Sequence, residues 1–185
     1  MMTYYPTIPT VLKDGTEMIS YAHDGDAGLD LCATEDVTLY PGEWKMVGSG
    51  VSMAIPKGFV GLVTPRSGLG CKGLVLKNAI GIIDAGYRGE IKVPLYNNNP
   101  THVWQKSYNE SFSQRLRRTI YDLLLLPCTN RGNVSAKGTI HVHKGDRVAQ
   151  LLIVPVSQAT LVACESLDET ERNVKGFGST GVGRL

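Results

Sequence analysis

Short hydrophobic runs separated by turns that contain glycine and proline make up most of this chain. Residues 37–39, 45–55 and 59–63 are β-prone, and turns at Pro41-Gly42 and at residues 56–58 divide them. Further strand candidates lie at residues 74–76, 79–83, 90–95, 140–143 and 148–156. Many short strands with frequent turns predict an all-β domain with a jelly-roll-like barrel architecture.

The segment between residues 99 and 138 breaks this pattern. Within it, residues 110–126 carry hydrophobic side chains four positions apart, which predicts a helix. From residue 166 the chain is polar and then rich in glycine, so residues 166–185 are expected to form a flexible C-terminal arm. We therefore expect one domain over residues 1–185, with an insert at residues 99–138.

Composition excludes several classes of function. The chain has 185 residues, 42% of them hydrophobic, which is typical of one globular domain. A net charge of +2 is too small to indicate nucleic-acid binding, and the longest aliphatic run, residues 123–126, is too short to cross a membrane. The four cysteines form no CxxC pair and the N-terminal residues do not resemble a signal peptide. We expect a soluble, cytoplasmic protein with reduced thiols.

The most informative motif is Gly81-Ile82-Ile83-Asp84-Ala85-Gly86-Tyr87-Arg88-Gly89. It places one carboxylate in a glycine-bracketed turn and an aromatic ring three residues later. A carboxylate held in this way is typical of a general base beside a flat or puckered ligand. The alternative is a hairpin in which Asp84 only helps to form the turn.

Two other motifs offer groups that bind phosphate. Arg66 and Ser67 lie in a glycine-containing turn after a strand, where a guanidinium, a hydroxyl and backbone N–H groups could cradle phosphate oxygens. Gln150 enters a strong strand from the turn at residues 145–147 and could donate a hydrogen bond to a ligand. The alternatives are a loop with a surface arginine and a turn that faces solvent.

The C-terminal arm contains a ring that has no core to join. Phe177 stands among glycines and resembles a lid that stacks on a base, with Ser179 and Thr180 placed to hold phosphate. Arg172 and Lys175 add positive charge that a triphosphate would use. A disordered tail is the alternative.

Two remaining features concern metals. Asp30 lies on a predicted strand among apolar residues, where a carboxylate needs a partner, either a hydrated Mg²⁺ nearby or an arginine in the core. His141 and His143 would share one face of a strand, but no third ligand follows them, so we interpret them as a surface pair.

Taken together, five motifs in order resemble the homotrimeric dUTP nucleotidohydrolases (dUTPases). They comprise residues 27–31, 65–69, 81–89, 145–150, and Arg172 with residues 176–181. The resemblance implies a β jelly-roll subunit and a homotrimer with three active sites at subunit interfaces. The reaction would be Mg²⁺-assisted hydrolysis of dUTP to dUMP and pyrophosphate, which limits uracil incorporation into DNA and supplies dUMP for dTTP synthesis.

The resemblance also implies a role for each motif residue. Asp84 would activate the water that attacks the α-phosphorus, Tyr87 would stack under the deoxyribose, and Asp30 would contact Mg²⁺ through water. The substrate-binding residues would be Asn78, Gly81 and Ile83 for uracil, Arg66, Ser67, Gly68 and Gln150 for phosphates, Phe177 as a cap on uracil, and Arg172, Gly178, Ser179 and Thr180 for the outer phosphates. Most of the Mg²⁺ coordination would come from the triphosphate.

The chain departs from a compact member of this family in two places. Asn173 and Lys175 stand where glycines are usual, and asparagine tolerates the left-handed backbone conformation that such a position requires. The position of the insert resembles the extra segment of some phage dUTPases. We hypothesise that it docks a protein partner; the alternative is that its helix packs on its own barrel. A dCTP deaminase and a dUTP-binding regulator are the competing readings of function.

Overall fold

Strands form where hydrophobic side chains alternate with polar ones, because neighbouring side chains on a strand point to opposite faces. The computed structural model describes residues 6–100, 138–170 and 173–174. Its strands are β1 (Thr10–Leu12), β2 (Leu29–Cys32), β3 (Val37–Leu39), β4 (Trp44–Met53), β5 (Phe59–Pro65), β6 (Leu74–Leu76), β7 (Gly81–Ile83), β8 (Glu90–Asn97), β9 (Ile140–Val142) and β10 (Arg147–Pro155). In β8, for example, Ile91, Val93 and Leu95 are buried while Lys92 is exposed.

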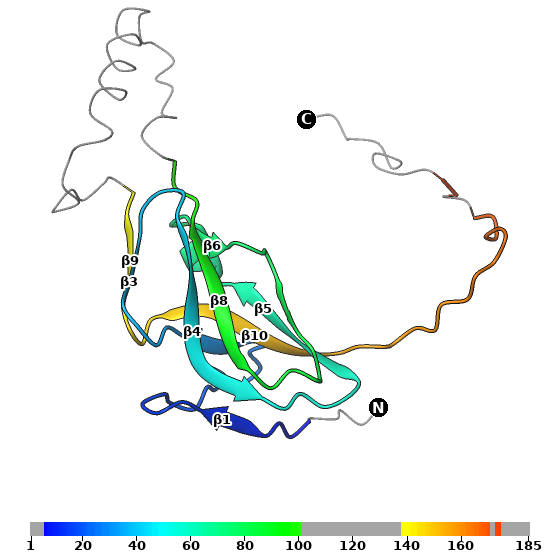
Figure 1. Cartoon of the computed structure of the whole chain (residues 1–185), viewed down its shortest axis with the longest axis horizontal. Helices are drawn as coiled ribbons and strands as arrows, with labels where there is room; N and C mark the ends of the chain where they lie inside the picture. Colours follow the sequence, from blue (N-terminus) through cyan, green and yellow to red (C-terminus); the bar gives the residue numbers. More distant parts are fainter. Residues whose placement is uncertain (1–5, 101–137, 171–172, 175–185) are drawn as a thin grey trace, which may run out of the picture.

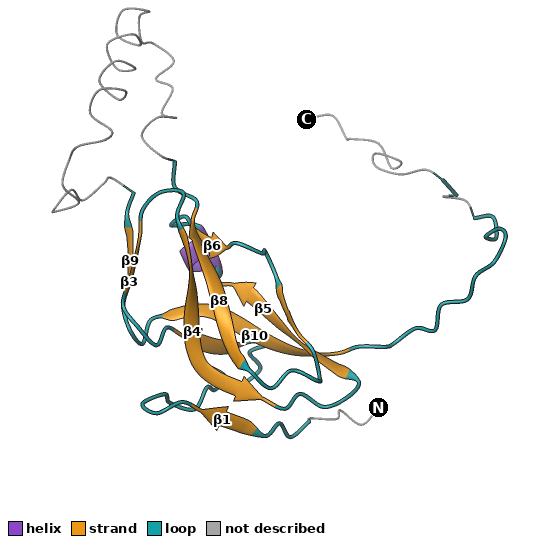
Figure 2. Ribbon diagram, viewed as in Figure 1, coloured by secondary structure: helices purple, strands orange, loops and turns teal. Residues whose placement is uncertain are grey.

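The strands form two four-stranded antiparallel sheets and a two-stranded ribbon, coloured orange in Figure 2. One sheet has the order β1-β4-β8-β6, the other β2-β10-β5-β7, and β3 pairs with β9 (Figure 1). Both sheets and the ribbon contribute to a single hydrophobic core that includes Leu31, Leu39, Val51, Leu95 and Leu151. Sequentially distant segments therefore lie side by side, and this places β2, β10 and β5 next to one another.

A bulge interrupts the pairing of β4 with β8 between Gly48 and Ser52. Glu90 fills the gap, since its carboxylate oxygen Oε1 accepts a hydrogen bond from the backbone N–H of Gly50 at 2.9 Å. Ser49, which is buried, donates a hydrogen bond from its hydroxyl to the carbonyl oxygen of Ile91 at 2.6 Å. Side chains thus replace the backbone bonds that the bulge removes.

Asparagine side chains join the two ends of the predicted insert, Asn99 and Gly138, to each other and to the core. Asn97 is completely buried, and its Nδ2 donates to the carbonyl oxygens of Leu39 (2.9 Å) and Gly138 (2.8 Å). Asn99 Nδ2 donates to the same Gly138 oxygen at 3.1 Å, and Asn99 N donates to Asn97 Oδ1 at 3.0 Å. Hydrogen bonds therefore join the point where the chain leaves β8 to the point where it returns before β9.

The all-β prediction is confirmed, and the predicted strands lie within a few residues of the observed ones. A short helix, α1 (Ser67–Gly70), stands where we predicted a turn, and it is the only helix among the described residues. The predicted helix at 110–126 lies outside those residues, and the jelly-roll connectivity stays a prediction. No helix in the described part of the chain is long and apolar enough to cross a membrane.

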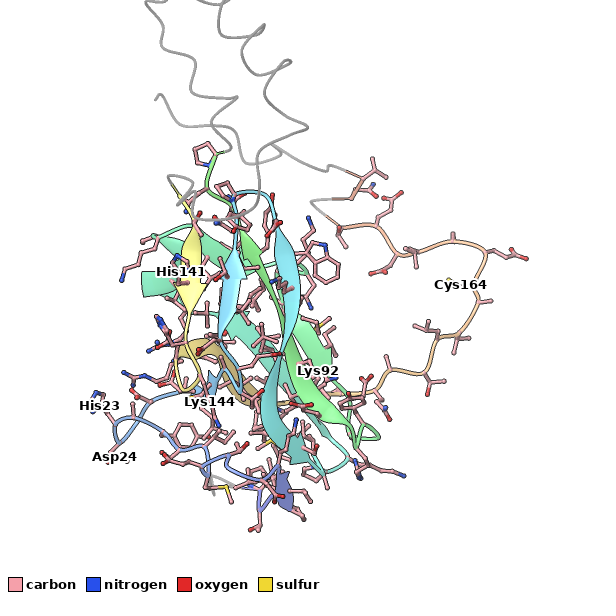
Figure 3. The ribbon with its side chains drawn as sticks, turned by 60° about the vertical axis from the view of Figure 1, so that its left-hand side comes forward. His23, Asp24, Lys92, His141, Lys144 and Cys164 are labelled. Atoms are coloured by element: carbon pink, nitrogen blue, oxygen red, sulfur yellow. The ribbon has the colours of Figure 1, made fainter. Side chains whose placement is uncertain are left out.

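Beyond β10 the described chain runs away from the sheets (Figure 1). Its hydrophobic side chains are almost fully exposed, with Leu161 at 93% and Leu167 at 84%. Figure 3 shows Cys164 on this extended segment, away from the core. Within one subunit, the hydrophobic side chains of this segment therefore gain little from burial.

Candidate active site

A pocket of about 390 Å³ lies against β7 and β8 and collects the residues of the hairpin motif. Its lining includes Asn78, Gly81, Ile83, Asp84 and Tyr87. The motif does not form the β-hairpin that the sequence suggested, because β7 pairs with β5 while β8 belongs to the other sheet. A hydrogen bond of 3.0 Å from Tyr87 N to Asp84 O closes the turn between them. The fold thus brings together all five residues that the motif assigned to the nucleoside and to catalysis.

Asp84 is exposed at this turn, and its carboxylate makes no hydrogen bond or ion pair with residues 6–100, 138–170 or 173–174. The turn is held by other groups. Arg88 Nη1 donates to the carbonyl oxygens of Ala85 and Tyr87, each at 2.7 Å. Asp84 therefore does not stabilise the turn through its side chain, and its carboxylate is available to accept a proton from water.

A second group of charged residues gathers where β2, β5 and β10 meet. Asp30 on β2 is 11% exposed at its side chain and lies between two guanidinium groups. Arg66 Nε is 3.2 Å from Asp30 Oδ1, and Arg147 Nη1 donates to Asp30 Oδ2 at 3.3 Å. Arg66 Nη1 also donates to the carbonyl oxygen of Arg147 at 3.1 Å. One carboxylate therefore holds two arginines side by side, and their remaining N–H groups can bind an anion.

The other predicted phosphate ligands lie beside this charged cluster. Gln150 is directly opposite Asp30 in the pairing of β10 with β2. A Cβ atom at Gly28 would lie 3.1 Å from Gln150 Cβ, so the glycine leaves room for the glutamine side chain. Ser67 and Gly68 follow Arg66 directly in α1. The first, second and fourth motifs therefore meet at one place.

Asp84 and Arg66 lie at different points along β5, since Asp84 follows β7 and Arg66 follows β5 itself. Asp84 follows Ile83, which pairs with Gly61, whereas Arg66 follows Pro65, which pairs with Ala149. Gly61 and Pro65 are separated by roughly 13 Å at about 3.3 Å per residue. Because β7 runs antiparallel to β5, Asp84 and Arg66 continue in opposite directions from these two points, and one chain places the Asp84 carboxylate away from the arginine pair.

The described residues could hold Mg²⁺ only together with a bound ligand that supplies most of its coordination. They contain no group of three or more His, Cys, Asp or Glu side chains that could hold a metal. Asp30 has the arginine partners that the sequence left as an alternative, although its Oδ1 is buried and accepts no hydrogen bond. His141 Nδ1 lies 3.1 Å from Thr38 Oγ1, and His143 Nδ1 lies 3.6 Å from Asp146 Oδ2, so the histidines have other partners.

Arg147 is a candidate site residue that the sequence argument did not single out. It belongs to the fourth motif, but nothing local indicates its contact with Asp30, which is 117 positions away. It also lines a second pocket of about 850 Å³ with Asp30, Cys32 and residues 13–20. Burial, and next the Asp30 carboxylate, raise the pKa of the Cys32 thiol, so this cysteine is less reactive than an exposed one.

The predicted residues of the arm, Arg172, Phe177, Gly178, Ser179 and Thr180, lie outside the described part of the chain. Asn173, which follows Arg172, is described, so the expected backbone conformation of this residue can be compared with the structure. Asn173 adopts a φ of +42°, the left-handed conformation that we expected an asparagine to tolerate there.

Comparison with known proteins identifies the family. The family model described as dUTPase matches residues 14–109 and 133–181, which is most of the chain. The chain belongs to the dUTPase family. The match leaves out residues 110–132, which fall within the predicted insert.

Curated dUTPase relatives and solved dUTPase structures resemble the chain over nearly its full length. The deoxyuridine 5′-triphosphate nucleotidohydrolase of Nocardia farcinica is 42% identical over 92% of this chain and 82% of its own length. That of Leifsonia xyli is 40% identical over 97% and 93%. The dUTPase of Staphylococcus bacteriophage 80alpha with dUPNHPP superposes with a TM-score of 0.76 at 32% identity, covering 96% of this chain and all of that one.

A further dUTPase neighbour bears on the metal. The dUTPase of phage phi11 of S. aureus, in a mutant form described as coordinating a structural Mg(II) ion, superposes with a TM-score of 0.66 at 29% identity. It covers 87% of this chain and 98% of its own.

Proposed function

We propose that this protein hydrolyses dUTP to dUMP and pyrophosphate, and so limits uracil incorporation into DNA and supplies dUMP for dTTP synthesis. The observation that carries the proposal is the hairpin pocket, which unites Asn78, Asp84 and Tyr87 in a cavity of about 390 Å³. A nucleoside needs a concave site with a few polar groups, and a carboxylate that has no side-chain partner among the described residues suits a water-activating base. The family and the named relatives support the same substrate.

The phosphates would bind at the arginine pair. Arg66 and Arg147 are held by Asp30 and keep N–H groups for phosphate oxygens, while Ser67 and Gln150 add neutral donors. Hydrolysis of a triphosphate depends mainly on alignment of the attacking water and neutralisation of charge. Bound Mg²⁺ would supply part of that neutralisation, with its ligands coming mainly from the triphosphate and with Asp30 acting through water.

The separation of the two groups of residues supports a site shared between subunits. The residues that precede Asp84 and Arg66 align with points on β5 that are roughly 13 Å apart, so the Asp84 turn of one copy would serve the arginine pair of another. We propose the homotrimer that the family resemblance implies, with the arm residues Arg172 and Phe177 closing each site. Sedimentation analysis tests this, because a monomer that turned over dUTP would contradict a shared site.

The test of the function is pyrophosphate release with Mg²⁺ from dUTP, dCTP, dTTP and UTP. We expect release from dUTP alone, and we expect Asp84→Asn to abolish it while binding of a non-hydrolysable dUTP analogue is retained. Among the described residues, Asp84 holds the turn only through its backbone carbonyl, which the substitution retains, so we expect the fold to stay intact. Release from dCTP would favour a deaminase-like specificity, and binding of dUTP without turnover would favour a regulator.

A further inference from the structure

The ring of Tyr87 lies over the backbone of its own turn. Its hydroxyl donates a hydrogen bond to the carbonyl oxygen of Glu90 at 3.0 Å. A Cβ atom built at Gly89 would lie 2.5 Å from the hydroxyl oxygen and 2.7 Å from Cζ of the same ring. Such distances are closer than real contacts allow, so any side chain at residue 89 displaces the ring.

Space, rather than backbone conformation, explains the glycine at residue 89. Gly89 is not among the glycines with positive φ, so an alanine could adopt its backbone conformation. Gly86 in the same turn also lacks a positive φ, but a Cβ atom there meets nothing within 4 Å. Neither glycine has a positive φ, but only residue 89 has the Tyr87 ring above it, which makes Gly86 a matched control.

Glu90 connects this ring to the neighbouring strand. Its carbonyl oxygen accepts the Tyr87 hydroxyl, and its side-chain Oε1 accepts the N–H of Gly50 at 2.9 Å in the bulge of β4. The Glu90 side chain is 25% exposed, which keeps this hydrogen bond partly shielded from water. Glu90 thus joins the Tyr87 hydroxyl, through its carbonyl oxygen, to strand β4, through its side chain.

We propose that Gly89 and Glu90 are positioning residues that seat the Tyr87 ring and thereby set the preference for deoxyribose over ribose. This inference rests on the proposed function. Tyr87 lines the hairpin pocket and is 44% exposed, so part of the ring is open to a ligand while Gly89 lies beneath it. A ring can exclude an extra hydroxyl only if it cannot move away, because steric rejection requires a fixed wall.

The test compares kcat/KM for dUTP and for UTP in Gly89→Ala and Gly86→Ala. We expect Gly89→Ala to lower the dUTP/UTP ratio at least about tenfold, since the displaced ring no longer supports the sugar or blocks the 2′ position. Gly86→Ala should keep the wild-type ratio. A purely structural defect would lower turnover of both substrates together and leave the ratio unchanged, and that result would overturn the inference.

A second pair of variants keeps the test decisive if Gly89→Ala does not fold. Glu90→Ala removes the acceptor for Gly50 N–H and should lower the ratio, whereas Glu90→Gln retains an acceptor oxygen and should restore most of it. Equal ratios in both Glu90 variants and the wild type would overturn the role of Glu90. If the wild-type protein does not hydrolyse dUTP, the proposed function itself is wrong. That result differs from an unchanged dUTP/UTP ratio, which would contradict only the role of Gly89 and Glu90.

Discussion

Replacing Asn97 with aspartate should destabilise the fold strongly, although the two side chains have the same shape. Asn97 is completely buried, and its Nδ2 donates to the carbonyl oxygens of Leu39 and Gly138. A carboxylate has no hydrogen to donate, so both bonds are lost and a negative charge faces two carbonyl oxygens. Gly138 keeps its bond from Asn99, but Leu39 loses the amide donor.

The magnitude follows from these contacts. Each lost bond costs about 0.5–1.5 kcal/mol, and a buried acceptor left without its partner costs about 1–3 kcal/mol. With the penalty for burying a charge, we expect a loss of about 3–5 kcal/mol in the free energy of unfolding. That is a large part of the roughly 5–15 kcal/mol available to a domain.

Urea unfolding at one fixed protein concentration measures this change, with Asn98→Asp as the control. Asn98 is exposed and contributes its backbone N–H to Gly73 O, so the same chemical change there should cost less than about 0.5 kcal/mol. The penalty at residue 97 should also shrink at about pH 5, because a protonated carboxyl regains one donor. A loss below about 1 kcal/mol, or one equal to that of the control, would refute the reasoning.

Three further predictions concern the site and its surroundings. Asp30→Asn removes a charge-assisted contact worth about 1.5–3 kcal/mol from the arginine pair, so kcat/KM for dUTP should fall roughly ten- to 150-fold; an unchanged value in steady-state kinetics would show that Asp30 does not position phosphate ligands. Deleting residues 100–137 behind a two-glycine linker should leave dUTP turnover within about twofold, since Asn99 and Gly138 are already joined by a hydrogen bond; a monomeric or inactive product would contradict this. In an alkylation time course at about pH 8, exposed Cys71 should react well before Cys32, whose pKa is raised by burial and by Asp30. Raising the pH should reduce the difference between the alkylation rates of Cys71 and Cys32, because more of the Cys32 thiol is then ionised. Equal rates at every pH would contradict the prediction.

Local sequence determined the strands and the composition of the candidate site. Alternation in segments such as residues 90–95 reflects a period of two that any half-buried strand must show, so the strands could be predicted before their partners were known. The turn around Asp84 and Tyr87 is also local, because it joins β7 to β8, which follow each other in the sequence. The short helix α1 was missed, since four residues with two glycines carry no helical periodicity.

Only the tertiary structure decided which distant residues meet. The contact of Asp30 with Arg147 spans 117 positions, and it exists because β10 pairs with β2 in one register and with β5 in another. The sequence could state that a carboxylate on a buried strand needs a partner, but it could not choose between arginine and a hydrated cation. In the same way, the Tyr87 hydroxyl bonds to Glu90, and the side chain of Glu90 is held by a bulge in β4 that the sequence did not predict. Strand periodicity is a property of neighbouring residues, whereas register and charge pairing are fixed by the packing of the whole core.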